Sequence, residues 1–141
     1  MHETSFVVDA SALLALLRLE KGWEDVAHII SRYDTDVYMS AINYAEVLSK
    51  TVAHGKNPDV VINEIRALGI QIMDFDSTLA EQTGLLKPRA AAWGLSLGDC
   101  ACLTLARQLD ATALTADKAW GNLGDSFRMT LIRQPKTNSP T

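Results

Sequence analysis

Residues 6–17, FVVDASALLALL, place a strand, an acidic residue and a helix directly after one another. The run at residues 6–8 is short, apolar and rich in valine, which is typical of a buried β-strand. Asp9 ends that run, and Leu13 and Leu17 then recur at the spacing of a helical face. The segment therefore predicts a strand that passes through an acidic turn into a helix.

The same alternation continues along the chain. Short apolar runs are separated by longer segments with helical periodicity, and glycines or prolines stand at their ends. The expected strands lie at residues 6–8, 37–39, 70–73, 112–115 and 127–132, and the expected helices at residues 10–21, 23–33, 41–54, 58–68, 76–93 and 98–109. This order predicts an α/β fold with a central parallel sheet of four to five strands and helices on both faces. Such sheets place their ligands at the carboxyl ends of the strands.

Length and composition indicate one globular domain. The 141 residues are 48% apolar and 21% charged, which excludes disordered and low-complexity classes. We expect one domain over residues 1–133, followed by a polar tail at residues 134–141, QPKTNSPT. The net charge of −4 excludes a globally basic nucleic-acid binder but leaves room for a local basic rim.

The chain carries no feature of an exported or membrane-spanning protein. No apolar run approaches the ~18 residues of a membrane span, and the first residues lack the pattern of a secretory signal. Cys100 and Cys102 lie in an apolar segment and fit small core residues better than a disulfide. We expect a cytoplasmic protein.

Four acidic residues stand where chemistry is expected. Asp9 and Asp117 follow strands, so both should lie at the same edge of the sheet. Asp99 falls in the first turn of the helix at residues 98–109, and Glu46 lies on the helix at residues 41–54. Each also has a simpler explanation, because acidic residues cap helices and cover surfaces.

The neighbours of two acids favour a functional role. The helix that starts beside Asp99 is apolar on almost every side, and a carboxylate at the mouth of a buried helix is costly unless it is paired. Glu46 lies ~40° from Ile42, at the edge of the expected apolar stripe of its helix. The residues of this expected stripe are Ile42, Ala45, Leu48, Ser49 and Val52.

If the four acids converge, they repel one another unless a cation joins them. With only oxygen ligands on offer, Mg²⁺ or Mn²⁺ fits better than zinc, and no His or Cys pair has metal-binding spacing. Such an ion suits phosphoryl chemistry, because it neutralises phosphate and activates water. Nucleotide-binding glycine loops and the G-x-S-x-G motif are absent from the sequence. An aspartyl-phosphate switch that uses Asp9 remains the rival from a different class.

Four blocks of sequence resemble a known family. They are VVDASALLALL (7–17), SAINYAEV (40–47), GLSLGDCACLTLA (94–106) and LTADKAW (114–120). In order and spacing they resemble PIN domains, and among these the VapC-type ribonuclease toxins of bacterial toxin–antitoxin pairs. The resemblance extends to about residue 132.

The resemblance implies a metal-dependent endonuclease that hydrolyses single-stranded RNA, for example a transfer RNA. Asp9, Glu46, Asp99 and Asp117 match the acidic catalytic quartet of the family. Asp9, Asp99 and Asp117 are the expected ligands of Mg²⁺ or Mn²⁺.

Further roles follow from the same resemblance. Ser11 and Thr115 match small hydroxyl positions beside the first and last acids, where they are expected to support the carboxylates. The basic residues expected around the site are Lys50, Lys87, Arg89 and Lys118. Relatives often carry a basic residue just ahead of the third block, but here its position is shifted.

The resemblance also implies partners. Relatives are usually homodimers and are inhibited by a small VapB-type antitoxin that presents basic side chains to the acidic site. The alternative within the same fold is a catalytically inactive PIN-like module that binds RNA or protein.

Overall fold

The computed structural model describes residues 4–132, which form a five-stranded parallel sheet with the strand order β3-β2-β1-β4-β5. The strands are β1 (Ser5–Val8), β2 (Asp36–Ser40), β3 (Gln71–Met73), β4 (Thr112–Thr115) and β5 (Met129–Leu131). The predicted α/β class and parallel sheet are confirmed. The predicted tail at residues 134–141 lies outside the described residues.

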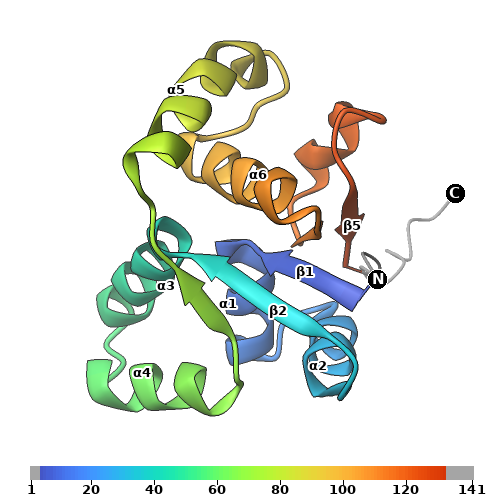
Figure 1. Cartoon of the computed structure of the whole chain (residues 1–141). Helices are drawn as coiled ribbons and strands as arrows, with labels where there is room; N and C mark the ends of the chain where they lie inside the picture. The colour runs from blue at the N-terminus through green and yellow to red at the C-terminus, as the bar shows by residue number, and fades with distance from the viewer. Residues whose placement is uncertain (1–3, 133–141) are drawn as a thin grey trace, which may run out of the picture.

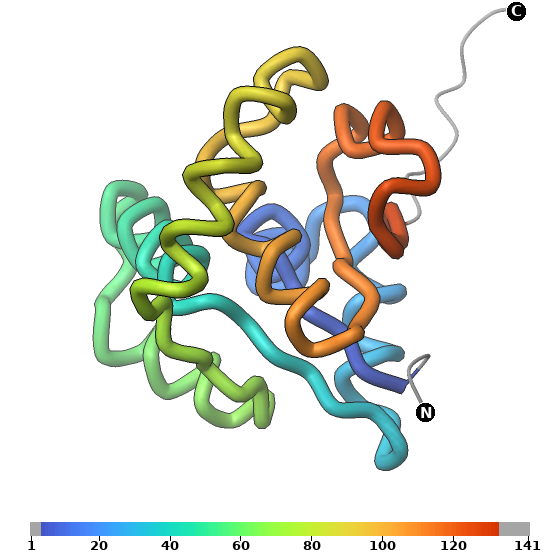
Figure 2. Tube along the Cα trace, turned by 45° about the horizontal axis from the view of Figure 1, so that its top comes forward, coloured from blue at the N-terminus to red at the C-terminus, as the bar shows by residue number. Residues whose placement is uncertain are grey.

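Helices cover both faces of the sheet (Figure 1). They are α1 (Ala10–Arg18), α2 (Trp23–Ser31), α3 (Ala41–Ala53), α4 (Pro58–Ala67), α5 (Ser77–Ala91), α6 (Leu97–Leu109) and the short 3₁₀ helix η2 (Lys118–Leu123). Figures 1 and 2 both show α5 and α6 together as one layer, and these two helices pack closely on each other. In these described elements, no helix combines the length and hydropathy that a membrane crossing requires.

The core is divided by the sheet, because side chains alternate between its faces. On β1, Val7 points into the cluster beneath α5 and α6, whereas Val8 points into the cluster beneath α1–α4. On β4, Ala113 and Leu114 repeat this division. Both faces of the two central strands are therefore buried, as their continuous apolar runs predict.

Side-chain caps start the helices at the carboxyl edge of the sheet. Asp9 accepts a hydrogen bond from the backbone of α1, and Ser40 does the same for α3. Ser96 and Asp99 form a reciprocal capping box at the start of α6. Pro88, which predicts a break or bend, lies within α5, and this helix continues to Ala91.

One helical face differs from its prediction. The buried residues of α3 are Asn43, Val47 and Thr51, whereas Ile42 and Val52 of the expected apolar stripe are exposed. The expected stripe was wrong because two of the buried positions carry polar side chains, which hydropathy alone assigns to the surface. The observed buried face of α3 is rotated from the expected one, so that Asn43 faces α6.

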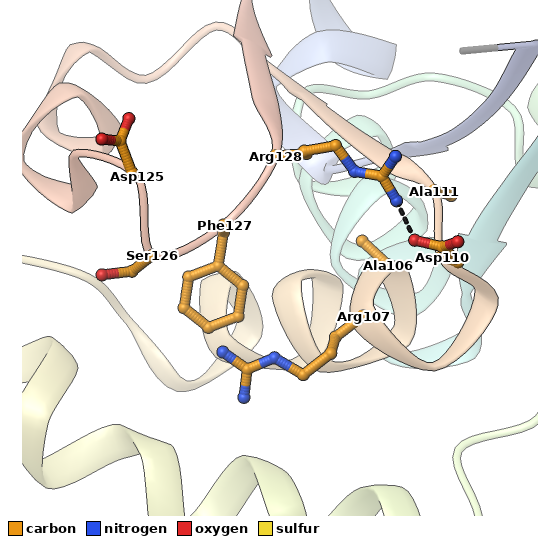
Figure 3. Close-up of a pocket in the computed structure, with 8 residues that line it drawn as sticks. All are labelled: Ala106, Arg107, Asp110, Ala111, Asp125, Ser126, Phe127 and Arg128. Carbon is orange, nitrogen blue, oxygen red and sulfur yellow. Dashed lines mark hydrogen bonds and ion pairs between the residues drawn. The ribbon is translucent and has the colours of Figure 1, made fainter. Parts of the chain in front are cut away.

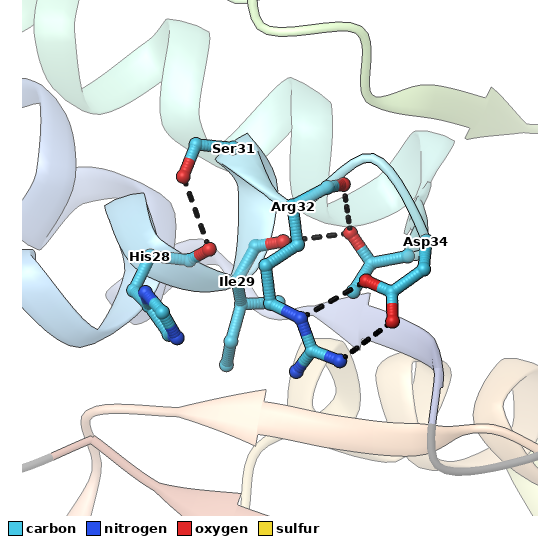
Figure 4. Close-up of polar contacts among 6 residues, drawn as sticks. His28, Ile29, Ser31, Arg32 and Asp34 are labelled. Atoms are coloured by element: carbon cyan, nitrogen blue, oxygen red, sulfur yellow. Dashed lines mark hydrogen bonds and ion pairs between the residues drawn. The ribbon is translucent and has the colours of Figure 1, made fainter.

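The connection from α2 to β2 is held by local polar contacts (Figure 4). The guanidinium of Arg32 donates two hydrogen bonds to the Asp34 carboxylate, of 3.0 and 2.9 Å. The Thr35 hydroxyl donates to the carbonyl of Ile29 at 2.7 Å. These contacts are exposed or half-buried, so we assign them to the shape of the loop rather than to global stability.

A buried pair of hydroxyls joins α5 to α6 and yields a stability prediction. Thr104 donates to the carbonyl of Ala101 at 3.2 Å, so the 2.8 Å bond between the two hydroxyls is donated by Thr83. Thr104→Val leaves the Thr83 donor without its acceptor and should lower the free energy of unfolding by about 1–3 kcal/mol. Urea denaturation should show that Thr83→Val/Thr104→Val costs less than the sum of the single substitutions. Additive costs would contradict this pairing.

Candidate functional site

Asp9 lies at the centre of the candidate site. It follows β1 directly, and its backbone N–H donates a 3.0 Å hydrogen bond to the carbonyl of Leu114 on β4. Its side chain is only 2% exposed, although it faces the carboxyl edge of the sheet. The first acid of the expected quartet is therefore recessed below the surface.

Three donors hold the Asp9 carboxylate. Oδ1 accepts from the Ala12 backbone N–H at 2.8 Å and from the Ser11 hydroxyl at 2.8 Å. Oδ2 accepts from the Thr115 hydroxyl at 2.6 Å. A carboxylate offers about four acceptor positions, so these donors leave roughly one of them open.

The two hydroxyls cannot easily turn away from Asp9. The Ala116 N–H donates to the Ser11 hydroxyl at 3.0 Å, and the Asp117 N–H donates to the Thr115 hydroxyl at 3.0 Å. Because a carboxylate only accepts, each hydroxyl donates its single hydrogen to Asp9, while its oxygen is held by the bond from the backbone. Ser11 and Thr115 therefore contact the acid that the sequence expects them to support.

Burial raises the pKa of Asp9 to about 6 from 3.8. The hydrogen bonds from Thr115, Ala12 and Ser11 act in the opposite direction, and the negative charge of Asp99 adds to the rise. Among residues 4–132, no cationic side chain contributes to this balance. Asp9 is thus a buried carboxylate whose neighbouring charge is another carboxylate.

Asp99 stands at the N-terminus of α6 and is half-buried. Its Oδ2 accepts from the Ser96 backbone N–H at 2.8 Å, as the capping-box pattern predicts. Within residues 4–132, Oδ1 of Asp99 has no hydrogen-bond donor, so the cap uses only one of its oxygens. The other oxygen is available to a ligand.

Glu46 is held against α6 by Asn43. The buried Asn43 amide donates to Oε1 of Glu46 at 2.8 Å and to the carbonyl of Gly98 at 3.1 Å. Gly98 makes room for this arrangement, since a Cβ at this position would lie 2.5 Å from Oε1 of Glu46. The glycine thus lets the carboxylate of α3 rest on the first turn of α6.

The Asn43 side chain leaves one polar atom without a partner. Carboxylate and carbonyl oxygens only accept hydrogen bonds, so the NH₂ group must face Glu46 and Gly98. Oδ1 of Asn43 then points elsewhere, and among the described residues it is a buried acceptor with no donor. An unpaired buried acceptor close to acidic groups is compatible with a bound cation or its water.

Asp117 is the fourth acid and lies next to the Thr115 pair. It caps η2, where Oδ1 accepts from the Ala119 backbone N–H at 3.0 Å. Its side chain is half-buried. The Asp117 backbone is joined to Asp9 through the Thr115 hydroxyl.

Three of the acids share one neighbourhood. Burial, followed by the negative charges of Asp9, Asp99 and Glu46, raises the pKa of the Cys102 thiol well above 9.0. Across residues 4–132, however, no three His, Cys, Asp or Glu side chains form a ready metal-binding group. The all-oxygen donor set still fits Mg²⁺, which is usually held by one or two carboxylates together with water and substrate phosphate.

The basic residues expected around the site occupy different places. Lys50 and Lys118 are exposed, and Lys118 directly follows Asp117. The Arg89 guanidinium lies 5.8 Å from the centre of the Trp93 ring. Lys87 is half-buried, and its charge partly offsets the rise that burial causes in the pKa of Cys100. A role in RNA binding stays a prediction for all four.

A second pocket lies at the opposite end of β4 (Figure 3). There Arg128 forms an ion pair with Asp110, and the Arg107 guanidinium covers the Phe127 ring at 4.1 Å. Asp110 precedes β4, whereas the acidic site follows it. This pocket is therefore separate from the candidate site.

A comparison with protein-family models matches the PIN domain over residues 6–125. The chain belongs to the PIN domain family. Comparison with curated proteins gave no match.

Solved structures share the fold of this PIN domain. VapC20 of Mycobacterium tuberculosis, described as a sarcin-ricin loop cleaving toxin, has a TM-score of 0.72 at 18% identity, over 92% of this chain and 99% of that chain. VapBC2 of Rickettsia felis, bound to a fragment of promoter DNA, has a TM-score of 0.68 at 14% identity, over 90% and 98%. FitAcB of Neisseria gonorrhoeae has a TM-score of 0.65 at 24% identity, over 88% and 95%.

Two residues of the site in this PIN domain were not predicted from the sequence. Asn43 precedes Glu46 by three positions, the spacing of neighbours on a helix, which is the signal that could have identified it. Gly98 follows Ser96 by two positions and is the first residue of a predicted apolar helix. A glycine that has no turn function there indicates that another part of the chain packs closely against the helix. Both act on Glu46 rather than directly on Asp9.

The raised pKa of Asp9 predicts a pH dependence of stability. A carboxyl whose pKa is 3.8 unfolded and about 6 folded stabilises the fold fully below pH 3.8, and this contribution is lost as pH rises through about 6. As the pH rises in EDTA, the free energy of unfolding of the wild-type chain should therefore fall relative to that of Asp9→Asn, by at most about 3 kcal/mol. Urea denaturation from pH 4 to pH 7 measures this difference. Parallel pH curves would exclude the predicted shift.

The contact between Gly98 and Glu46 predicts that a substitution can disturb the site while leaving the stability of the fold nearly unchanged. Gly98→Ala should displace the flexible end of Glu46 and break its bond with Asn43, while changing the melting temperature little. Calorimetric titration with Mg²⁺ should then show several-fold weaker binding. Gly84→Ala is the matched control, since its Cβ meets nothing within 4 Å. Unchanged Mg²⁺ binding in Gly98→Ala would show that the position of Glu46 is unimportant.

Proposed function

We propose that this PIN domain is a Mg²⁺- or Mn²⁺-dependent endoribonuclease that hydrolyses phosphodiester bonds of single-stranded RNA. The observation that supports the proposal is the recessed Asp9, which is held by three donors and lies near Asp99. Asp9, Asp99 and Glu46 all act on the Cys102 thiol, and no cation of residues 4–132 is among the groups that shift the pKa of Asp9. Burying a carboxylate beside other carboxylates is costly, and a site that binds a divalent cation explains why the cost is retained. We expect the protein to act in the cytoplasm.

The roles of the side chains follow from their contacts. Asp9, Asp99 and Asp117 would hold the ion, which would supply positive charge to the phosphate and lower the pKa of water. Ser11 and Thr115 fix the direction of the Asp9 oxygens.

Glu46 has a different place, because Asn43 binds its Oε1 and the lack of a side chain at Gly98 lets the whole carboxylate rest on the start of α6. We assign it to orienting water or a ligand at the mouth of the site. Its position on α3 makes the geometry depend on how α3 and α6 pack.

The preference for single-stranded RNA rests on the recession of Asp9. A phosphate can approach a carboxylate that is 2% exposed only if its backbone bends toward the site. A paired A-form helix resists this bending, whereas a single strand or a loop permits it.

We further propose that the protein is the toxin of a type II toxin–antitoxin pair, inhibited by a VapB-type antitoxin and assembled as a homodimer. Several solved structures with this fold are toxin–antitoxin complexes, which supports the proposal. An antitoxin that presents Arg or Lys to the recessed acids would neutralise them and block the approach of phosphate.

Cleavage of RNA tests the enzymatic proposal. The purified chain, free of antitoxin, should cleave pooled cellular RNA in Mg²⁺ and lose this activity in EDTA. Asp99→Asn should lower cleavage at least a hundredfold while it retains the fold, because the half-buried carboxylate would lose its charge but keep its cap acceptor. Sequencing of the cleavage ends identifies the RNA.

Glu81→Gln is the matched control, since Glu81 is an exposed acid on α5. Cleavage that survives EDTA would contradict metal dependence. Binding of RNA without cleavage would favour the inactive module. Labelling of Asp9 by acetyl phosphate would instead revive the aspartyl-phosphate switch.

A further inference from the structure

A cleft of roughly 600 Å³ opens directly beside the acidic site. Its inner end is lined by Ser11, which bonds Asp9, and by Ala116, which lies between Thr115 and Asp117. Its outer part is lined by the end of α1 and by α3. The cleft therefore adjoins residues that contact or neighbour Asp9 and Asp117.

The outer part of the cleft is cationic. Arg18, Lys21 and Lys50 line it, and Glu20 is the single acid among the described residues that line it. All three basic side chains are exposed, and within residues 4–132 none of them forms an ion pair. Their charge is thus available to an anionic ligand.

The backbone fixes where these cations stand. Leu19 ends α1 in the left-handed conformation, with φ of 52°, and the Glu20 N–H donates to the carbonyl of Ala15 at 2.8 Å. The Trp23 N–H then donates to the carbonyl of Glu20 at 3.0 Å, which closes a turn around Lys21. The segment between α1 and α2 is therefore a hydrogen-bonded turn that presents its basic residues in a defined place.

Apolar surface accompanies the charge. Leu19 is 66% exposed and lines the cleft together with the buried Leu14. Arg18 also lines an adjoining pocket that contains His54, Lys56 and Glu64, so Arg18 and Lys56 extend the basic surface away from the acids. A nucleic-acid strand carries one phosphate charge per nucleotide, so it matches a surface on which cations continue beyond the acids.

We propose that the cleft binds the phosphate of a nucleotide next to the scissile one, with Arg18, Lys21 and Lys50 as its counter-charges. The inference rests on the proposed RNA cleavage and adds the path that the strand takes. Carboxylates alone repel RNA, so a cationic surface that adjoins them is needed to hold the strand. Leu19 offers apolar contact to the sugar or base.

The test compares Arg18→Gln/Lys21→Gln with Arg66→Gln, whose residue is an exposed arginine on α4 outside the cleft. Each variant is made with Asp99→Asn, and binding of a fluorescent single-stranded RNA is measured by anisotropy across KCl concentrations in Mg²⁺. The double variant should bind several-fold more weakly, and its salt slope should fall by about 0.7 for each phosphate that the variant no longer neutralises. Arg66→Gln should match its parent.

Cleavage separates this proposal from the function on which it rests. With Asp99 intact, Arg18→Gln/Lys21→Gln should cleave a long RNA more slowly, yet cleave a dinucleoside monophosphate, which has no neighbouring phosphate, at the wild-type rate. Arg18→Lys should restore much of the RNA affinity, which a purely structural role would not predict. If the wild type cleaves RNA but the double variant and its parent have equal salt slopes, the proposal that the cleft binds phosphate is wrong. This holds even if the double variant loses binding of an acidic peptide. Absence of any wild-type cleavage would overturn the proposed function itself.

Discussion

The short hydrogen bond from Thr115 to Asp9 is the interaction on which the site depends. It joins the ends of two parallel neighbours, β1 and β4, at the edge where the sheet delivers its functional residues. Because the Thr115 hydroxyl also accepts from the backbone of Asp117, one side chain sets the position of two acids. The remaining acids come from α6 and α3, so the site assembles only when both layers pack on the sheet.

Much of the fold could be predicted from the sequence, because each strand is a short apolar run and each helix has a visible start. The acidic helix start at Asp9, directly after β1, and the capping box of Ser96 and Asp99 are local features, and the structure contains both. The buried face of α3 could not be predicted, since Asn43 and Thr51 are polar residues whose burial depends on partners elsewhere in the chain. Hydropathy cannot reveal which polar side chains find a buried hydrogen-bond partner.

The acids differ in how far sequence reasoning reaches. Their positions on elements follow from strand ends and helix starts, but the chain of donors from backbone through Ser11 and Thr115 to Asp9 is a tertiary property. The cationic cleft is also tertiary, because Lys50 of α3 and Arg18 of α1 are 32 positions apart in sequence. Charge composition, which is acidic overall, gives no indication of it.

The close approach of Gly98 to Glu46 has a consequence for how such chains diverge. A methyl group at position 98 and a glutamate at position 46 compete for the same space, whereas the shorter aspartate would withdraw from it. The two positions are therefore expected to change together across descendants of this sequence. A lineage that acquires alanine at 98 would keep its fold but lose this placement of the acid, and a shorter acid on the neighbouring helix would relieve the conflict.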